Sequence, residues 1–125
     1  MDNRQLALVV EDDSYLSDVF SKAVQKAGYA VEVVTNGKMA RERLAAVAPA
    51  VVILDLHLPQ VSGADLLMEI RADERLTKTR VIVATGDPYL ANNLRPMADL
   101  VLIKPVGYVQ LRDLAKHLLD TDRLD

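Results

Sequence analysis

Short aliphatic runs alternate along this chain with segments in which apolar residues recur at helical spacing. This alternation predicts repeated strand–helix units, in which the strands lie parallel in one sheet and helices cover both of its faces. The pattern gives five such units, with strands predicted at residues 6–10, 30–35, 51–55, 81–85 and 100–103. The second of these runs alternates most and carries a glutamate, which favours a place at the edge of the sheet.

The predicted helices have recognisable start and stop signals. The first begins near Ser14 and ends at Gly28, a residue suited to the left-handed conformation that ends many helices. The helix from Pro88 to Leu94 is short, and two asparagines and a following proline weaken it. Others are predicted at about 37–47, around 66–70 and around 111–118, the last ending in a polar tail at 121–125. We therefore expect an α/β, flavodoxin-like, doubly wound sheet of five parallel strands in the order 2-1-3-4-5, with five helices.

Composition limits the chain to one domain. Its 125 residues and 13.8 kDa, half of them apolar, allow a single compact core, so we expect one domain over 1–125 with its core at about 6–119 and no second domain. Only 4% of residues are aromatic and tryptophan is absent. The core must therefore be aliphatic, as suits a buried parallel sheet.

Charge and residue usage exclude several classes of protein. The net charge is −3 and the basic residues are scattered along the sequence, so direct binding to nucleic acid is not expected. Without cysteine, disulfides and thiolate zinc sites are impossible, and the two histidines, His57 and His117, lie far apart in sequence. Because the chain has no secretion signal and no run long enough to span a membrane, we expect a soluble, cytoplasmic protein.

Polar residues end, or directly follow, four of the predicted strands, at the edge where such sheets hold their ligands. They are the acidic run 11–13, then Asp55, Thr85 and Lys104. Converging carboxylates repel one another, so the arrangement calls for a hard cation, for which Mg²⁺ or Mn²⁺ is suited. With a hydroxyl and an ammonium beside them, the site can bind phosphoryl oxygens, and Asp55 can attack phosphorus.

Each of these residues also has a plain structural explanation. The acidic run 11–13 could serve only as a helix cap and first turn. Thr85 and the Gly86-Asp87-Pro88 segment could form an ordinary turn with a cap, and Lys104 could be a surface lysine. What favours a site is that all of them fall at the same edge of the predicted sheet.

The motifs resemble those of the receiver domains of two-component response regulators. The resemblance runs from Leu6 to about Leu119 and rests on sequences at fixed positions along the chain. These are Val-Val-Glu-Asp-Asp at 9–13, Val-Ile-Leu-Asp-Leu-His-Leu-Pro at 52–59 with Ser-Gly at 62–63, Val-Ile-Val-Ala-Thr-Gly at 81–86, and Leu-Ile-Lys-Pro at 102–105.

The resemblance implies a phosphoacceptor module that works in phosphorelay signal transduction. Asp55 would accept a phosphoryl group from a sensor histidine kinase or a phosphotransfer protein. Asp12, Asp55 and the backbone carbonyl of His57 would bind Mg²⁺ or Mn²⁺, with Glu11 acting through a water molecule. Such a module is not an enzyme in the usual sense, because its only substrate is its own aspartate.

The resemblance also implies how the phosphorylated state is held and passed on. Thr85 would hydrogen-bond the phosphate, Lys104 would pair with it, and the peptide bond before Pro105 would be cis. The partners implied are the kinase, a downstream protein or an output domain outside this chain, and a second copy of the chain. His57 and Asp87, each two residues past a site residue, are expected to modulate the lifetime of the acyl phosphate.

The sequence departs from the family pattern in two places. The interval between Thr85 and Lys104 is a few residues shorter than is usual, and the switch position three residues before Lys104, commonly aromatic, is Val101. A β-branched valine has little rotamer freedom, so the usual inward swing of an aromatic ring is not expected. We expect the output to be a local reordering of residues 85–97 instead.

Two other functions compete with this reading. A receiver-like interaction module that works without phosphorylation is the main alternative, suggested by the altered switch. A phosphohydrolase of the haloacid dehalogenase type is a remote one, because that family places a second aspartate where this chain has His57, and the chain leaves no room for a cap domain.

Overall fold

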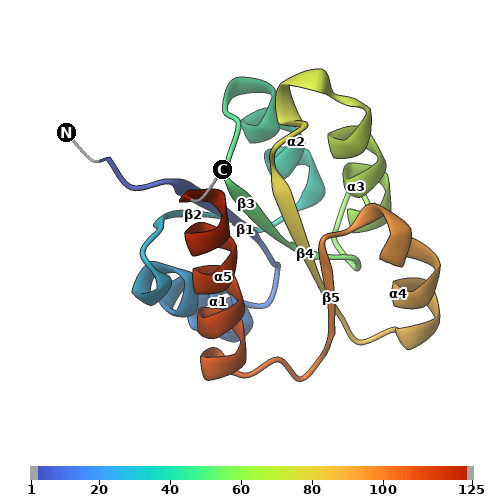
Figure 1. The fold of residues 1–125 in the computed structure, drawn as a ribbon. Coiled ribbons are helices and arrows are strands. Elements are labelled where there is room, and N and C mark those ends of the chain that lie inside the picture. The colour runs from blue at the N-terminus through green and yellow to red at the C-terminus, as the bar shows by residue number, and fades with distance from the viewer. Residues whose placement is uncertain (1–2, 124–125) are drawn as a thin grey trace.

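The computed structural model describes residues 3–123 and shows one parallel sheet between two layers of helices (Figure 1). The strands lie in the order β2-β1-β3-β4-β5, as predicted. Their bounds are Leu6–Val10 for β1, Ala30–Val34 for β2, Val51–Asp55 for β3, Arg80–Thr85 for β4 and Leu100–Ile103 for β5. The helices are α1 (Ser14–Ala27), α2 (Gly37–Ala46), α3 (Gly63–Ala72), α4 (Pro88–Leu94) and α5 (Tyr108–Arg123).

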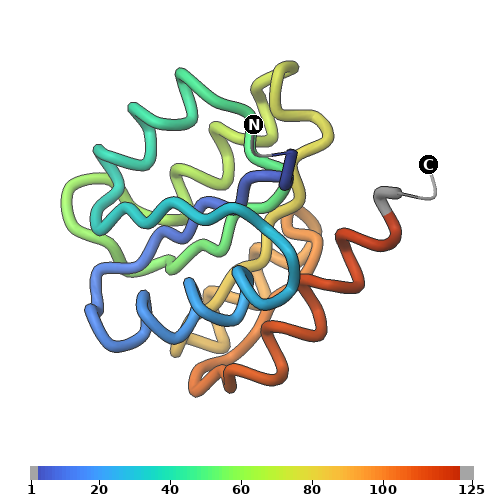
Figure 2. The backbone as a smooth tube through the Cα atoms, turned by 90° about the vertical axis from the view of Figure 1, so that its left-hand side faces the viewer, coloured from blue at the N-terminus to red at the C-terminus, as the bar shows by residue number. Residues whose placement is uncertain are grey.

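The continuous aliphatic runs are explained by burial on both faces of the sheet. In β1, Ala7 and Val9 belong to the core cluster formed with α1 and α5, whereas Leu8 and Val10 belong to the cluster formed with α2 and α3. Figure 2 shows α1 and α5 running together on one side of the sheet. The edge strands β2 and β5 are exceptions, because β2 has three half-buried residues and one exposed residue, and β5 has two half-buried residues and one exposed residue.

Four helices begin with a polar cap at the same edge of the sheet, just past the carboxyl ends of the strands. The side chains of Asp13, Asn36, Ser62 and Asp87 each accept a hydrogen bond from the backbone N–H three residues later. At the other end of α1, Gly28 has φ 120°, which a residue with a side chain rarely adopts. The caps fix the loops that follow the strands, and these loops carry the candidate site.

The structure differs from the sequence prediction at the margins of elements and in two short additional helices. Two short 3₁₀ helices, Glu74–Leu76 and Arg95–Met97, were not predicted. The predicted polar tail begins inside α5, which continues to Arg123, and residues 124–125 lie outside the described part. Among residues 3–123 no helix is long and apolar enough to cross a membrane.

Candidate functional site

Three carboxylates meet where β1 and β3 end. Oxygen atoms of Glu11, Asp12 and Asp55 all lie within 4.8 Å of one another. Glu11 is only 1% exposed and Asp55 5%, whereas Asp12 is exposed. Because β1 and β3 are paired in parallel, their carboxyl ends lie side by side. Because three charges this close repel one another, and their oxygens are the donors that hard divalent cations prefer, the cluster fits a metal ion such as Mg²⁺.

The acidic run 11–13 divides into separate roles. Asp13 is the cap of α1, and its Oδ1 accepts a hydrogen bond of 2.8 Å from the Leu16 N–H. Its own N–H donates to Glu11 Oε2 at 3.2 Å. The capping explanation therefore applies to Asp13, and it leaves Glu11 and Asp12 to the carboxylate cluster.

Lys104 reaches this cluster from the end of β5. Its Nζ donates to Glu11 Oε1 at 2.7 Å and lies 3.6 Å from Asp55 Oδ2. The backbone holds it there, because its N–H donates to the Thr85 carbonyl at 2.8 Å and the bond to Pro105 is cis. Lys104 is thus a site lysine rather than a free surface residue, and its ammonium is shared by two buried carboxylates.

The ionisation of this pair is strongly shaped by its surroundings. Burial raises the pKa of Glu11 to about 7, against the hydrogen bonds from Lys104 and Asp13, which lower it. For Lys104, burial alone would lower the pKa, but the hydrogen bond to Glu11 and the charges of Asp55 and Glu11 outweigh it and raise the pKa. The ammonium therefore stays charged, while burial favours the protonated form of Glu11.

Thr85 ends β4, beside the aspartate. It is fully buried, and it follows Ala84, the residue paired with Asp55 across the sheet. Its Oγ1 accepts a hydrogen bond of 3.1 Å from the Asp87 N–H. Asp87 in turn caps α4 by accepting from the Leu90 N–H. The turn-and-cap explanation thus holds for Asp87, and the Thr85 hydroxyl lies at the start of the same turn.

The loop after β3 folds back over Asp55. The His57 N–H donates to Asp55 Oδ1 at 3.2 Å. The His57 ring points into solvent, with its Nε2 3.9 Å from Asp87 Oδ2 and side-chain exposures of 63% and 41%. His57 and Asp87 therefore face each other at the surface of the site, and the exposed ring agrees with a loop residue.

Two features of the site were missed from the sequence. One is the ion pair between Glu11 and Lys104, residues 93 positions apart, for which no local signal exists. The other is the close approach at Gly63, where an added Cβ would lie 2.1 Å from the Asp55 carbonyl oxygen. A glycine after a serine cap was visible in the sequence, but only the packing of α3 against the end of β3 shows why it must be glycine.

Known proteins resemble the chain over nearly its full length. The family model "Response regulator receiver domain" matches residues 7–116. The transcriptional regulatory protein BasR of Escherichia coli is 33% identical over 115 residues, which are 90% of this chain and 51% of BasR. The transcriptional regulator RpaA of Synechocystis is 29% identical, over 94% of this chain and 50% of its own. The chain thus spans about half the length of these relatives.

Solved structures agree. The receiver domain of a putative Luxo repressor protein from Vibrio parahaemolyticus is 32% identical and superposes with a TM-score of 0.85, covering 97% of this chain and 94% of that one. The family found is one of signalling modules, which decides between the receiver and the phosphohydrolase readings of the sequence. Together with the acidic cluster at the strand ends, these matches show that the chain belongs to the receiver domain family of two-component response regulators.

Proposed function

We propose that this domain is a phosphoacceptor whose own Asp55 carries the phosphoryl group. The observation that supports this most is the placement of Asp55. Its carboxylate is 5% exposed, lies in a cluster with two further carboxylates, and has an ammonium 3.6 Å away. A buried carboxylate in such a setting is suited to nucleophilic attack on phosphorus.

In the proposed step an Asp55 carboxylate oxygen attacks the phosphorus of the donor. A new bond forms between that oxygen and phosphorus, and the bond from phosphorus to the leaving group breaks, which releases imidazole from a phosphohistidine or acetate from acetyl phosphate. Glu11, Asp12, Asp55 and the His57 carbonyl are the groups that would hold Mg²⁺, with Glu11 acting through a water. When bound, the ion would neutralise charge on the phosphoryl oxygens.

Lys104 and Thr85 would hold the product. The Lys104 ammonium already lies between Glu11 and Asp55, so a phosphate on Asp55 needs only a small shift of Nζ to replace one carboxylate partner by another anion. The Thr85 hydroxyl at the end of the neighbouring strand would donate to a phosphate oxygen. A shift of the Thr85 hydroxyl would also move Asp87, because the Asp87 N–H donates a hydrogen bond to Thr85 Oγ1.

The partners follow from this chemistry. The donor would be a sensor histidine kinase or a phosphotransfer protein, and the phosphorylated state would control a downstream protein, an output domain or pairing with a second copy. BasR and RpaA are named as transcriptional regulators, which gives gene control as one class of output. Since the donor's phosphate comes from ATP, the proposal includes a cytoplasmic location. It also includes a single domain over the chain given.

We propose that His57 and Asp87 set the lifetime of the acyl phosphate. Both side chains stand at the solvent side of the cluster, 3.9 Å apart, where a hydrolytic water must approach. The test is the dephosphorylation rate of His57→Ala and of Asp87→Asn, because asparagine keeps the capping acceptor of α4 and removes only the charge. Rates equal to the wild type in both variants would reject this role.

The signal would be read out through residues 85–97. Val101 is half-buried and packs against the same core cluster as Leu94 and Met97. It therefore offers a fixed apolar contact rather than a movable ring. We expect phosphorylation to change the order of the segment that α4 belongs to. Amide hydrogen exchange with and without a phosphate mimic tests this, and unchanged protection over 85–97 would refute it.

The central test is a phosphorylation assay. Incubation with acetyl phosphate and Mg²⁺, followed by intact-mass measurement, should give a one-phosphate adduct in the wild type and none in Asp55→Ala. Omitting Mg²⁺ should suppress the adduct. No adduct in the wild type would favour the alternative, an interaction module that works in one fixed state.

A further inference from the structure

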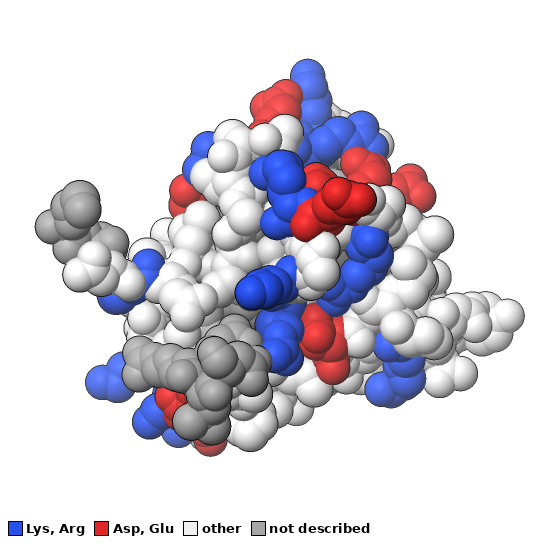
Figure 3. Space-filling view, turned by 45° about the horizontal axis from the view of Figure 1, so that its top comes forward, with Lys and Arg blue, Asp and Glu red and all other residues white. Residues whose placement is uncertain are grey.

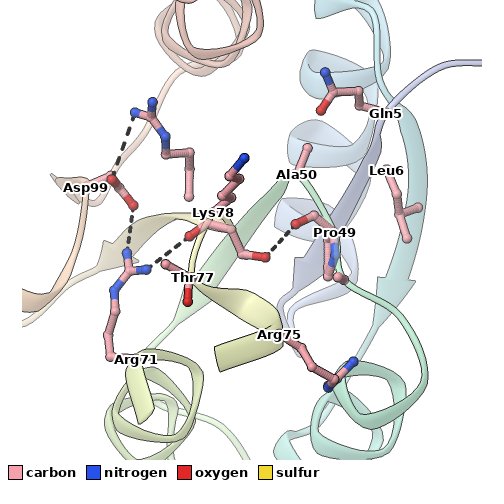
Figure 4. Close-up of a pocket in the computed structure, with 12 residues that line it drawn as sticks. Gln5, Leu6, Pro49, Ala50, Arg71, Arg75, Thr77, Lys78 and Asp99 are labelled. Atoms are coloured by element: carbon pink, nitrogen blue, oxygen red, sulfur yellow. Dashed lines mark hydrogen bonds and ion pairs between the residues drawn. The ribbon is translucent and has the colours of Figure 1, made fainter. Parts of the chain in front are cut away.

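A hollow lies at the opposite end of the sheet from Asp55. Its volume is about 770 Å³, within the usual range of small-molecule sites. It is lined by residues at or just before the starts of β1, β3, β4 and β5, by the last turn of α3 and by the 3₁₀ helix Glu74–Leu76 (Figure 4). In a parallel sheet these strand starts share one edge, so the hollow is built on rigid elements and is separate from the phosphoacceptor site.

The hollow is basic although the protein is acidic. Four of its lining residues, Arg71, Arg75, Lys78 and Arg80, are cationic, and one, Asp99, is anionic. The whole chain carries a net charge of −3. Figure 3 views the molecule from this side and shows lysine and arginine side chains gathered near the middle of the face, with acidic side chains among them. The concentration of positive charge here therefore runs against the composition of the chain.

Part of this basic character has a structural cause. Helices α2 and α3 end at this edge, and cations are favoured beside the carbonyl groups of helix ends. Arg75 donates to the Leu44 carbonyl and pairs with Asp73. Arg71 donates to the carbonyls of Met97 at 2.6 Å and Thr79 at 3.0 Å. These bonds fix the two guanidinium groups in place, but carbonyl groups carry no formal charge that would neutralise Arg71.

The carboxylate in the hollow is heavily shared. Asp99 Oδ2 accepts from Arg71 at 2.7 Å and from the Val81 N–H at 2.7 Å, and Arg80 lies 4.0 Å from its other oxygen. Asp99 thus contacts both guanidinium groups, and Arg80 has a further interaction besides this one. Lys78 is exposed and makes no ion pair with any residue between 3 and 123. The Lys78 ammonium therefore supplies positive charge at the rim of the hollow that an anion could neutralise.

The opposite wall is of another kind. Leu6, Ala48, Pro49 and Ala50 present mostly apolar atoms, with the Gln5 amide at the margin. Figure 4 shows Gln5, Leu6, Pro49 and Ala50 together on one side and Arg71 with Asp99 on the other. The Thr79 hydroxyl, which lies between them, is already committed to the Pro49 carbonyl at 2.7 Å. A ligand that fits both walls must have an anionic end and an apolar end.

We propose that this hollow binds a small phosphorylated organic molecule of nucleotide size. Its phosphates would lie against Lys78, Arg80 and Arg71, and its apolar part would rest on Leu6 and Pro49. A compact ligand agrees better with a hollow between strand ends than an extended acidic protein segment does. The site is independent of Asp55, so it can be tested without phosphorylation.

The experiment is a titration of the ¹⁵N-labelled protein followed by NMR, in EDTA, with ATP as the probe. We expect saturable amide shifts at residues 5–6, 48, 50, 77–80 and 99, with residues around Asp55 and Lys104 unaffected. Lys78→Glu should weaken ATP binding about tenfold or more. Lys38→Glu makes the same change of charge on an exposed residue at the start of α2, at the other end of the sheet, and should alter binding less than twofold.

Comparison ligands separate the alternatives. Adenosine, which lacks the phosphates, should not bind measurably, and pyrophosphate should bind more weakly than ATP. The proposal is overturned by the absence of saturable shifts, by shifts centred on Lys104, or by equal losses in the two lysine variants. Pyrophosphate binding as tight as ATP, or tighter binding of a short polyglutamate peptide, would also overturn it, because neither ligand offers the apolar end.

Discussion

The packing of α3 against the end of β3 makes Gly63 a sensitive position. A Cβ added to Gly63 would lie 2.1 Å from the Asp55 carbonyl oxygen and 2.5 Å from Leu56 Cα. Both are backbone atoms of the strand end, so no side chain can rotate away. Gly63→Ala would force the start of α3 outward by roughly 1 Å. Overpacking of this kind lowers the free energy of unfolding by about 1–3 kcal/mol.

The same shift would damage a hydrogen bond. The Gly63 N–H donates to the Leu56 carbonyl at 3.0 Å, and a buried bond of this kind contributes about 1 kcal/mol. We therefore expect Gly63→Ala to lower the free energy of unfolding by about 2–4 kcal/mol, measured by urea denaturation, and to slow phosphorylation of Asp55. Gly86→Ala is the matched control, because nothing lies within 4 Å of its added Cβ. Equal stability of the two variants would refute the close-approach argument.

Three further changes test other parts of the structure. Arg71→Met should lower the free energy of unfolding by about 2 kcal/mol in urea denaturation, since it removes the donor to the Met97 and Thr79 carbonyls and leaves Asp99 Oδ2 with only the Val81 N–H, and Arg41→Met, which breaks an exposed pair, should cost less; the reverse order would contradict this. Tyr29→Phe should lower the melting temperature through loss of a buried bond worth about 1 kcal/mol, and an unchanged value would count against that bond. In EDTA, Glu11→Gln should raise the free energy of unfolding above that of the wild type, and this gain should increase from pH 5 to pH 8. The reason is that a pKa of about 7 for Glu11 means that folding disfavours its charged form. A gain that stays the same across this pH range would contradict the raised pKa.

The fold was predictable because its signals are local. Both faces of the central strands are buried, so each strand appears as an unbroken aliphatic run such as Ala7–Val10. Helix starts were marked by caps, and the short α4 was placed at Pro88–Leu94 as the structure has it. The 3₁₀ helix at Glu74–Leu76 was missed because three residues leave no periodicity to detect.

The candidate site was predictable as a set of residues but not as a geometry. Parallel strands bring their carboxyl ends together, so Asp55, Thr85 and Lys104 could be placed at one edge from their positions alone. Which of Glu11 and Asp12 is buried, and that Glu11 pairs with Lys104, depends on the packing of segments far apart in sequence. The basic hollow was not predicted either, because its lining residues come from segments that are far apart in sequence.

The most direct measurement is to locate the phosphate by chemical trapping. After incubation with acetyl phosphate and Mg²⁺, borohydride reduces an aspartyl phosphate to homoserine, which peptide mass spectrometry assigns to a position. We predict homoserine at position 55 alone, and none when Mg²⁺ is replaced by EDTA. Homoserine at position 12, or unmodified Asp55 in a protein that is folded and loaded with Mg²⁺, would contradict the assignment of Asp55 as the phosphoacceptor.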